Sequence, residues 1–249
     1  MIVPATSPST AVLDHATSVS EQLLAVCWRQ WRTERSLRKR GIDFRTTVPG
    51  DARRAYSAMT PAEFAAVNGR QAWANRRTIA SSLAGLIPDR PLLVLDLGCG
   101  IGESTRVLAS LVPAGSKIIG IEFAPPLVEV ANELGARAAA DHGRDVRFVV
   151  GSVVETFFDD EGAAVADETV DVVNASGIVG HHLDPPDAES AADEIFRVLR
   201  NRGIAALDVG PKLSARQLTT LMSDRGFERV RRTRSNPFDR TGQVVFRKR

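Results

Sequence analysis

From residue 91 onward, short apolar runs alternate with longer segments in which apolar residues recur every three or four positions. The short runs have the length and β-branched content of buried strands, and the longer segments have the period of amphipathic helices. This alternation predicts an α/β fold with a doubly wound, mostly parallel sheet and helices on both faces. The expected strands are 92–97, 117–122, 146–150, 170–174, 204–209, 227–234 and 243–247, and the expected helices are 104–112, 126–141, 186–200 and 214–225.

The first 88 residues follow a different pattern. Residues 1–17 are rich in Ser, Thr, Pro and Ala, and we expect them to be a disordered tail. Residues 18–88 are expected to form an N-terminal helical cap. Within it, Thr60 and Glu63 have the spacing of a capping box, so a helix starts there and runs, with a break at Gly69, to about Leu86. Residues 89–249 are then the main domain.

Residues 20–40 predict an earlier helix of the cap. Its apolar stripe consists of Leu23, Leu24, Cys27, Trp28 and Trp31. We expect this stripe to dock on the protein's own domain. The alternative is that the helix, which also carries several arginines, meets RNA or a membrane surface.

The turn after the first strand of the main domain has the most specific pattern in the chain. From Asp96 to Gly102 the sequence is D-x-G-x-G-x-G, followed by Glu103. The dinucleotide fingerprint G-x-G-x-x-G would need a glycine at position 103. A carboxylate beside the turn would repel a pyrophosphate but suits a ligand that carries an ammonium group and a ribose. Glu122 closes the next strand, where a ribose-binding acid stands in this topology. Its alternative role is to cap the turn that follows.

These residues resemble motif I of the class I S-adenosylmethionine-dependent methyltransferases. The resemblance covers about residues 91–249, and it implies a seven-stranded sheet with an antiparallel seventh strand and S-adenosyl-L-methionine as the cofactor. It also implies that Glu122 accepts hydrogen bonds from the ribose hydroxyls and that Phe123 flanks the adenine. The cofactor-binding residues of the first turn would be Asp96, Gly98, Cys99, Gly100 and Gly102.

The chain departs from this family after the third strand. The family usually carries an acid there for the adenine amino group, whereas this chain has Ser152 and Val153. The Ser152 hydroxyl or backbone groups could take over the adenine contact. The alternative is that Ser152 is an ordinary turn serine.

Ligands of open α/β sheets bind beyond the carboxyl ends of the strands, so the segment after the fourth strand should face the same cleft. Asn174 and Ser176 are expected to contact the cofactor. His181 and His182 are the catalytic candidates, because an imidazole can take a proton from the acceptor near neutral pH. Adjacent residues face different ways, so only one of them is expected to act as a base. The alternative is that they pack and hold the loop.

In many small-molecule methyltransferases an N-terminal segment closes over the cofactor and supplies an aromatic side chain. By this resemblance Tyr56 and Arg70 are candidate cofactor contacts within the cap. Burial in a helical core is the expected role of nearby Trp73.

Composition adds limits on the function. The 249 residues carry a formal net charge of +2, two cysteines and four histidines. This inventory predicts no disulfide framework and no metal site. Since neither a secretory leader nor a long apolar run is present, we expect a cytoplasmic protein without a membrane span.

The function we expect is methyl transfer from S-adenosylmethionine to a small-molecule acceptor through an O, N or C nucleophile, by a monomer or homodimer without a nucleic-acid partner. One alternative is an RNA-modifying methyltransferase that uses the basic C-terminal region. The other is a non-catalytic module that binds the cofactor.

Overall fold

The computed structural model describes residues 23–44, 54–233 and 242–249, and the side chains of residues 136–142 are not described. The predicted disordered tail, residues 1–17, lies outside these ranges. The chain divides into two compact units, residues 1–73 and residues 74–249. Each unit is described by itself.

The described residues of the N-terminal unit are largely helical. The unit contains α2 (Leu23–Lys39), α4 (Pro61–Val67) and the start of α5 (Gly69–Leu83). The predicted capping box is present, because the Glu63 amide donates to the Thr60 hydroxyl over 3.2 Å and the Thr60 amide donates to the Glu63 carboxylate over 3.0 Å. That this unit caps a ligand cleft stays a prediction.

The apolar stripe of α2 is only partly buried, with Leu23 and Cys27 half-buried, and its docking on the protein's own domain stays a prediction. Leu24, Trp28 and Trp31 are 80%, 60% and 47% exposed. The buried side chains of this helix are instead those of Val26, Gln30, Glu34 and Leu37. The two buried polar residues are satisfied there, since the Gln30 amide donates to Glu34 over 2.8 Å and its oxygen accepts from Arg70 Nε over 3.0 Å. Periodicity marks two faces of a helix, and these polar contacts decide which of them is buried.

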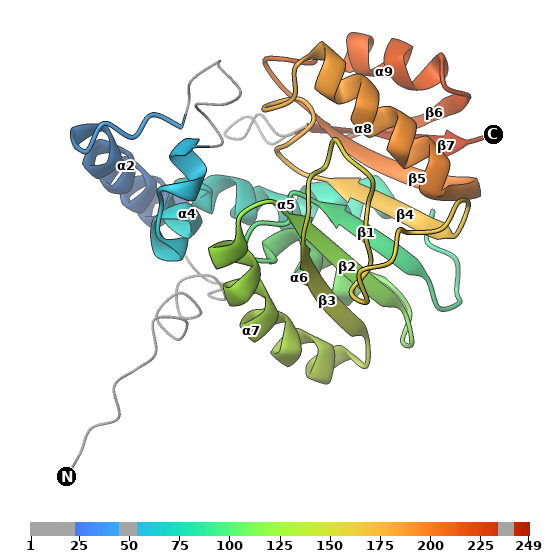
Figure 1. The fold of residues 1–249 in the computed structure, drawn as a ribbon, viewed down its shortest axis with the longest axis horizontal. Coiled ribbons are helices and arrows are strands. Elements are labelled where there is room, and N and C mark those ends of the chain that lie inside the picture. The colour runs from blue at the N-terminus through green and yellow to red at the C-terminus, as the bar shows by residue number, and fades with distance from the viewer. Residues whose placement is uncertain (1–22, 45–53, 234–241) are drawn as a thin grey trace. The chain divides into compact units, whose positions relative to one another are not determined.

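The C-terminal unit is built on a seven-stranded sheet (Figure 1). Its strands are β1 (Leu93–Leu97), β2 (Lys117–Glu122), β3 (Asp145–Val150), β4 (Val170–Ala175), β5 (Leu199–Val209), β6 (Phe227–Arg232) and β7 (Gly242–Lys248). The order is β3-β2-β1-β4-β5-β7-β6, and β7 runs antiparallel to both of its neighbours. The predicted sheet, including its antiparallel seventh strand, is confirmed.

Helices cover both faces of this sheet, also as predicted. They are α6 (Glu103–Leu111), α7 (Pro125–His142), α8 (Pro185–Val198) and α9 (Ala215–Ser223). One apolar cluster joins α8 and α9 to one face, and a second joins α5, α6 and α7 to the other. Alternate residues of a strand enter the two clusters: Val94 belongs to the second and Leu95 to the first.

β5 starts five residues earlier than predicted. Leu199 already pairs with Val170, and the register shifts between Val170 and Val172. Arg202 has a positive φ of 65° at this irregularity. The sequence analysis ended the preceding helix at residue 200 and left 201–203 unassigned, whereas these residues form a bulged extension of the strand.

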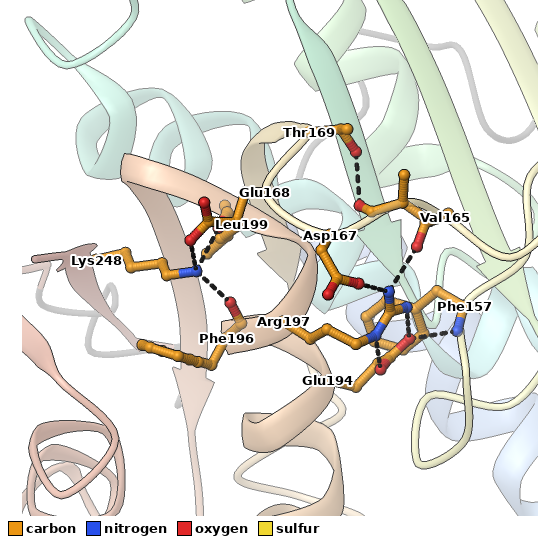
Figure 2. A network of polar contacts seen from close by, with 11 residues as sticks. Phe157, Val165, Asp167, Glu168, Thr169, Glu194, Phe196, Arg197, Leu199 and Lys248 are labelled. Carbon is orange, nitrogen blue, oxygen red and sulfur yellow. Dashed lines mark hydrogen bonds and ion pairs between the residues drawn. The ribbon is translucent and has the colours of Figure 1, made fainter.

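A polar network ties the segment between β3 and β4 to α8 and β7 (Figure 2). Arg197 donates to Glu194, to Asp167 over 2.6 Å and to the Val165 carbonyl over 2.8 Å. Lys248, which is 4% exposed, donates to Glu168 over 3.0 Å and to the carbonyls of Phe196 and Leu199 over 2.8 Å. The ammonium group of Lys248 is therefore hydrogen-bonded to other parts of the fold.

Phe148 of β3 fills a space that three glycines leave open. A Cβ at Gly102, Gly120 or Gly135 would lie 2.8, 2.5 or 2.3 Å from atoms of its ring. These glycines come from the turn after β1, from β2 and from α7. The ring therefore packs directly beneath the glycine-rich turn.

Candidate functional site

The strand order reverses beside β1, which pairs with β2 on one side and β4 on the other. The glycine-rich turn leaves β1 at this point. Gly98, Gly100 and Gly102 have φ values of +64°, +55° and +83°, which favour glycine. The amides of Gly98 and Cys99 donate to the Ile121 carbonyl over 2.8 and 3.2 Å, so β2 holds the turn in place.

Asp96 lies fully buried beneath this turn. Its carboxylate accepts from the hydroxyls of Ser104 and Thr105 over 2.6 Å and from the Asn174 amide over 2.7 Å. Burial raises the pKa of the Asp96 carboxyl, and these three hydrogen bonds oppose the rise. Both carboxylate oxygens thus link β1 to α6 and β4. A direct contact of Asp96 with the cofactor stays a prediction.

Asn174 and Ser176, predicted to contact the cofactor, are joined by a residue that the sequence analysis did not single out. Gln243 of β7 donates from Nε2 to Asn174 Oδ1 over 2.9 Å and to Ser176 Oγ over 3.1 Å. Asn174 and Gln243 are 0% and 1% exposed. The antiparallel seventh strand thereby braces the carboxyl end of β4.

Glu122 ends β2 beside the turn and is 3% exposed. Its carboxylate accepts from the Gly100 amide and from the Ala124 amide, each over 3.1 Å. Burial raises the pKa of Glu122, and the backbone amides of Ala124, Gly100 and Phe123 oppose this. A carboxylate has about four acceptor positions, so it retains acceptor capacity for hydroxyl donors. The capping contact is therefore present, and ribose binding by Glu122 with adenine flanked by half-buried Phe123 stays a prediction.

The segment after β3 shows the contact expected of a turn serine. Ser152 Oγ accepts from the Val154 amide over 3.4 Å, and Val153 packs partly buried against the apolar core. Adenine binding by these two residues stays a prediction.

The loop after β4 is organised around a residue that the sequence analysis missed. Asp208, fully buried in β5, accepts from the amides of Ile178, Val179 and Gly180, each over 3.0 Å. It also contacts His181 Nδ1 over 3.0 Å. A single acid inside the apolar run 204–209 was the available signal, because a buried carboxylate needs donors from elsewhere in the fold.

This contact fixes the chemistry of His181. A carboxylate only accepts hydrogen bonds, so Nδ1 carries the hydrogen and the neutral ring has its basic lone pair on Nε2. The His181 side chain is 22% exposed. An imidazole oriented by a buried carboxylate is an arrangement suited to general-base chemistry.

His182 has a different environment. Burial, the neighbouring charge of His181 and that of Lys212 lower its pKa to about 4, although Asp208 opposes them. Lys212 Nζ donates to the His182 carbonyl over 3.2 Å. With so low a pKa, His182 is poorly matched to proton removal near neutrality. Of the two predicted bases, the geometry favours His181.

The low pKa of His182 makes stability depend on pH. Unfolded His182 takes up a proton near pH 6.5 and folded His182 only near pH 4, so stability falls as the pH drops through this window. Partial exposure reduces the effect to about 2–3 kcal/mol. Between pH 7.5 and pH 4 the unfolding free energy of the unmodified protein should therefore decrease by about 2–3 kcal/mol more than that of His182→Gln. Urea denaturation at the two pH values measures both decreases. Equal losses would contradict the low pKa.

The loop and the glycine-rich turn meet. A Cβ on Gly98 would lie 2.2 Å from Cγ1 of Ile178, so the Ile178 side chain stands directly against the turn. A Cβ on Gly180 would lie 2.2 Å from the Gly210 amide nitrogen, because the loop also approaches the end of β5 backbone to backbone. The predicted cofactor turn and the predicted acceptor loop thus share one edge of the sheet.

Tyr56 and Arg70 belong to the N-terminal unit. Tyr56 packs against the rings of Phe44 and Phe64, with centroids 5.8 Å apart in both pairs. Arg70 donates to Gln30 from its backbone amide and from Nε. Their predicted cofactor contacts stay predictions.

Two further observations concern only the described residues. Among them, no group of three or more His, Cys, Asp and Glu side chains is arranged to hold a metal ion. None of the helices they form is long and apolar enough to cross a membrane.

Residues 94–203 match the family model of a methyltransferase domain. A demethylmenaquinone methyltransferase of Lactococcus lactis is 31% identical over 113 residues, which are 45% of this chain and 39% of that protein. A 23S rRNA (uracil(1939)-C(5))-methyltransferase of a Shewanella species is 34% identical over 103 residues, 41% of this chain and 21% of that protein. The chain therefore spans well under half the length of these relatives.

The fold is also that of solved methyltransferases. The crystal structure of an S-adenosylmethionine-dependent methyltransferase from Methanosarcina mazei superimposes with a TM-score of 0.53. It is 18% identical and covers 67% of this chain and 96% of its own. At this level of identity the similarity concerns the fold.

Proposed function

We propose that the chain transfers the methyl group of S-adenosylmethionine to a small-molecule acceptor, because residues 94–203 match the family model of a methyltransferase domain and the fold is that of a solved S-adenosylmethionine-dependent methyltransferase. The observation that carries this proposal is the pairing of Glu122 with the glycine-rich turn. A buried carboxylate holds the Gly100 amide over 3.1 Å and keeps acceptor capacity beside a turn in which Gly98, Gly100 and Gly102 carry no side chain. This donor and acceptor set fits a ribose and an ammonium group.

In this proposal the residues at the ends of β1 and β2 bind the cofactor, and the residues at the ends of β4 and β5 act on the acceptor. The turn from Gly98 to Gly102 and Glu122 hold S-adenosylmethionine, and Asp96 keeps the turn in shape. When bound, the cofactor supplies a methyl group on a positively charged sulfur. His181, held by Asp208, faces the acceptor and takes the proton from its O or N nucleophile.

Glu122→Ala tests the proposal. It removes charge-assisted hydrogen bonds worth about 1.5–3 kcal/mol, so we expect S-adenosylmethionine to bind about 10- to 150-fold more weakly by calorimetry. NAD should not bind the unmodified protein, because Glu103 stands where the dinucleotide fingerprint needs its third glycine, and its carboxylate would repel a pyrophosphate.

Glu189→Ala is a matched control, since it removes an exposed carboxylate from α8 that has no proposed contact with the cofactor. Tight NAD binding by the unmodified protein, or unchanged cofactor affinity in a folded Glu122→Ala variant, would contradict the proposal.

RNA is a second candidate acceptor, favoured by the similarity to an rRNA methyltransferase. The basic C-terminal region supports it less than the sequence suggested. Arg225 pairs with Asp193 over 2.5 Å, and Arg231 donates to the carbonyls of Ser81 and Ala84. Lys248 is likewise engaged in the network of Figure 2. Salt-dependent retention of the protein on RNA would favour this candidate.

A further inference from the structure

The exposed side of α2 carries an apolar patch that the described residues of its own unit leave uncovered. Leu24, Trp28 and Trp31 follow at steps of four and three residues, so they lie on one face of the helix. They are 80%, 60% and 47% exposed. Large apolar side chains gathered on a surface commonly mark an interaction site.

The same helix is strongly basic. It contains five basic residues, Arg29, Arg32, Arg35, Arg38 and Lys39, and one acid, Glu34. Glu34 is buried and already paired, since it accepts from Gln30 over 2.8 Å and from Arg38 over 3.4 Å. Arg32 and Arg35 are exposed one turn from the two tryptophans. The exposed surface of α2 is therefore complementary to a negatively charged partner.

We propose that α2 docks on the surface of an anionic phospholipid bilayer. In this arrangement Leu24 and the indoles of Trp28 and Trp31 enter the boundary between headgroups and acyl chains, while Arg32 and Arg35 contact lipid phosphates. A basic helix with one aromatic and aliphatic face has the composition of helices that lie in this boundary.

The geometry of the aromatic pair favours a lipid surface over RNA. Trp28 stacks on Trp31 with centroids 5.1 Å apart and planes 25° apart, and the Arg35 guanidinium lies 5.6 Å from the centroid of Trp31. Nucleic-acid bases stack on open aromatic faces. Here the two indoles stack on each other and Arg35 lies against Trp31, so part of the ring surface is occupied, whereas Leu24 is 80% exposed to an apolar medium.

Vesicle flotation of the full chain tests the inference. We use vesicles of phosphatidylcholine alone and of equal parts phosphatidylcholine and phosphatidylglycerol. The protein should float with the anionic vesicles and leave them at high salt. In a Trp73→Phe background the tryptophan emission should shift to the blue on binding, because only Trp28 and Trp31 remain.

Two double variants separate the contributions. Arg32→Gln/Arg35→Gln should lower the partition coefficient about 25-fold, at about fivefold for each charge removed. Trp28→Ala/Trp31→Ala should lose most of the binding. Arg216→Gln/Arg229→Gln removes two exposed charges from α9 and β6, and it should change little. All of these positions are exposed, and circular dichroism verifies that each variant is folded.

Three results would overturn the inference. The first is equal flotation with neutral and anionic vesicles, or a loss of vesicle binding in the control variant that equals the loss in the two double variants of α2. The second is binding of a single-stranded RNA that depends on Trp28 and Trp31 without vesicle binding. The third is a dimer in sedimentation that dissociates in the tryptophan variant, again without vesicle binding. Cofactor affinity is measured separately, so failure of the proposed methyl transfer does not affect this outcome.

Discussion

His181→Ala is expected to lower the methyl-transfer rate about 100- to 10,000-fold, which is the usual cost of removing a general base. Cofactor affinity should stay nearly unchanged, because His181 lies in the loop after β4 and the proposed cofactor contacts lie at the ends of β1 and β2. Single-turnover rates with a hydroxyl- or amine-bearing acceptor, identified by screening such compounds, measure the effect. Calorimetry with S-adenosylmethionine measures the cofactor affinity of the variant.

Asp208→Asn tests whether the carboxylate positions His181. Asparagine has nearly the same shape, but its amide nitrogen would face N–H donors where the carboxylate accepts four. The His181 ring should then lose its preferred tautomer. In a plot of methyl-transfer rate against pH, the limb that reflects protonation of the base should shift. A merely structural role would lower stability without moving that limb.

His182→Gln is the matched control for both variants. Because the pKa of His182 is about 4, this side chain stays neutral at pH 7, and its replacement should leave the rate close to that of the unmodified protein. A wild-type rate in folded His181→Ala would exclude the proposed base. A loss confined to His182→Gln would assign the role to the other histidine.

The sequence predicted the sheet well because its central strands, β1, β2 and β4, are buried on both sides and largely apolar. The bounds of β1 to β4 lie within one residue of their expected positions, and only β5 starts five residues early. The later start predicted for β5 has a physical cause, since Arg202 adopts a left-handed backbone that sequence patterns assign to turns. Local propensity could not show that Leu199 pairs with Val170.

The candidate site could be predicted where it is local in sequence. The glycine-rich turn and Glu122 belong to one β-α-β unit, so their spacing in the sequence was sufficient to predict that they lie side by side. The pairing of Asp208 with His181 spans 27 residues and depends on which strands are neighbours. The contact of Gln243 with Asn174 spans 69 residues and depends on the antiparallel return of β7. Neither has a sequence spacing that marks it.

For α2 the sequence pattern also did not show which face of the helix is buried. A stripe with two tryptophans looked like the buried side of the helix. The side chains that are buried include Gln30 and Glu34, whose polar atoms find partners in each other and in Arg70. Satisfied polar groups can be buried at low cost, and only the tertiary contacts reveal this.

Phe148→Ala is expected to destabilise the protein by about 3–5 kcal/mol, as is typical when a buried phenylalanine leaves a cavity. Phe148 is 6% exposed, and its ring occupies the space beside Gly102, Gly120 and Gly135. Urea denaturation measures the loss. Phe158→Ala is the control: this ring is 46% exposed, so its removal should change stability by no more than about 0.5 kcal/mol.

A second substitution in α7 makes the test specific to the packing around this ring. In the unmodified protein Gly135→Ala should destabilise, because the new Cβ would lie 2.3 Å from Cε2 of Phe148. In the Phe148→Ala background that atom is gone, and alanine is favoured over glycine within a helix by about 1 kcal/mol. Gly135→Ala should then stabilise, so its effect reverses sign between the two backgrounds. The same sign in both would show that Gly135 is required by the backbone of α7 and that the Phe148 ring does not determine it.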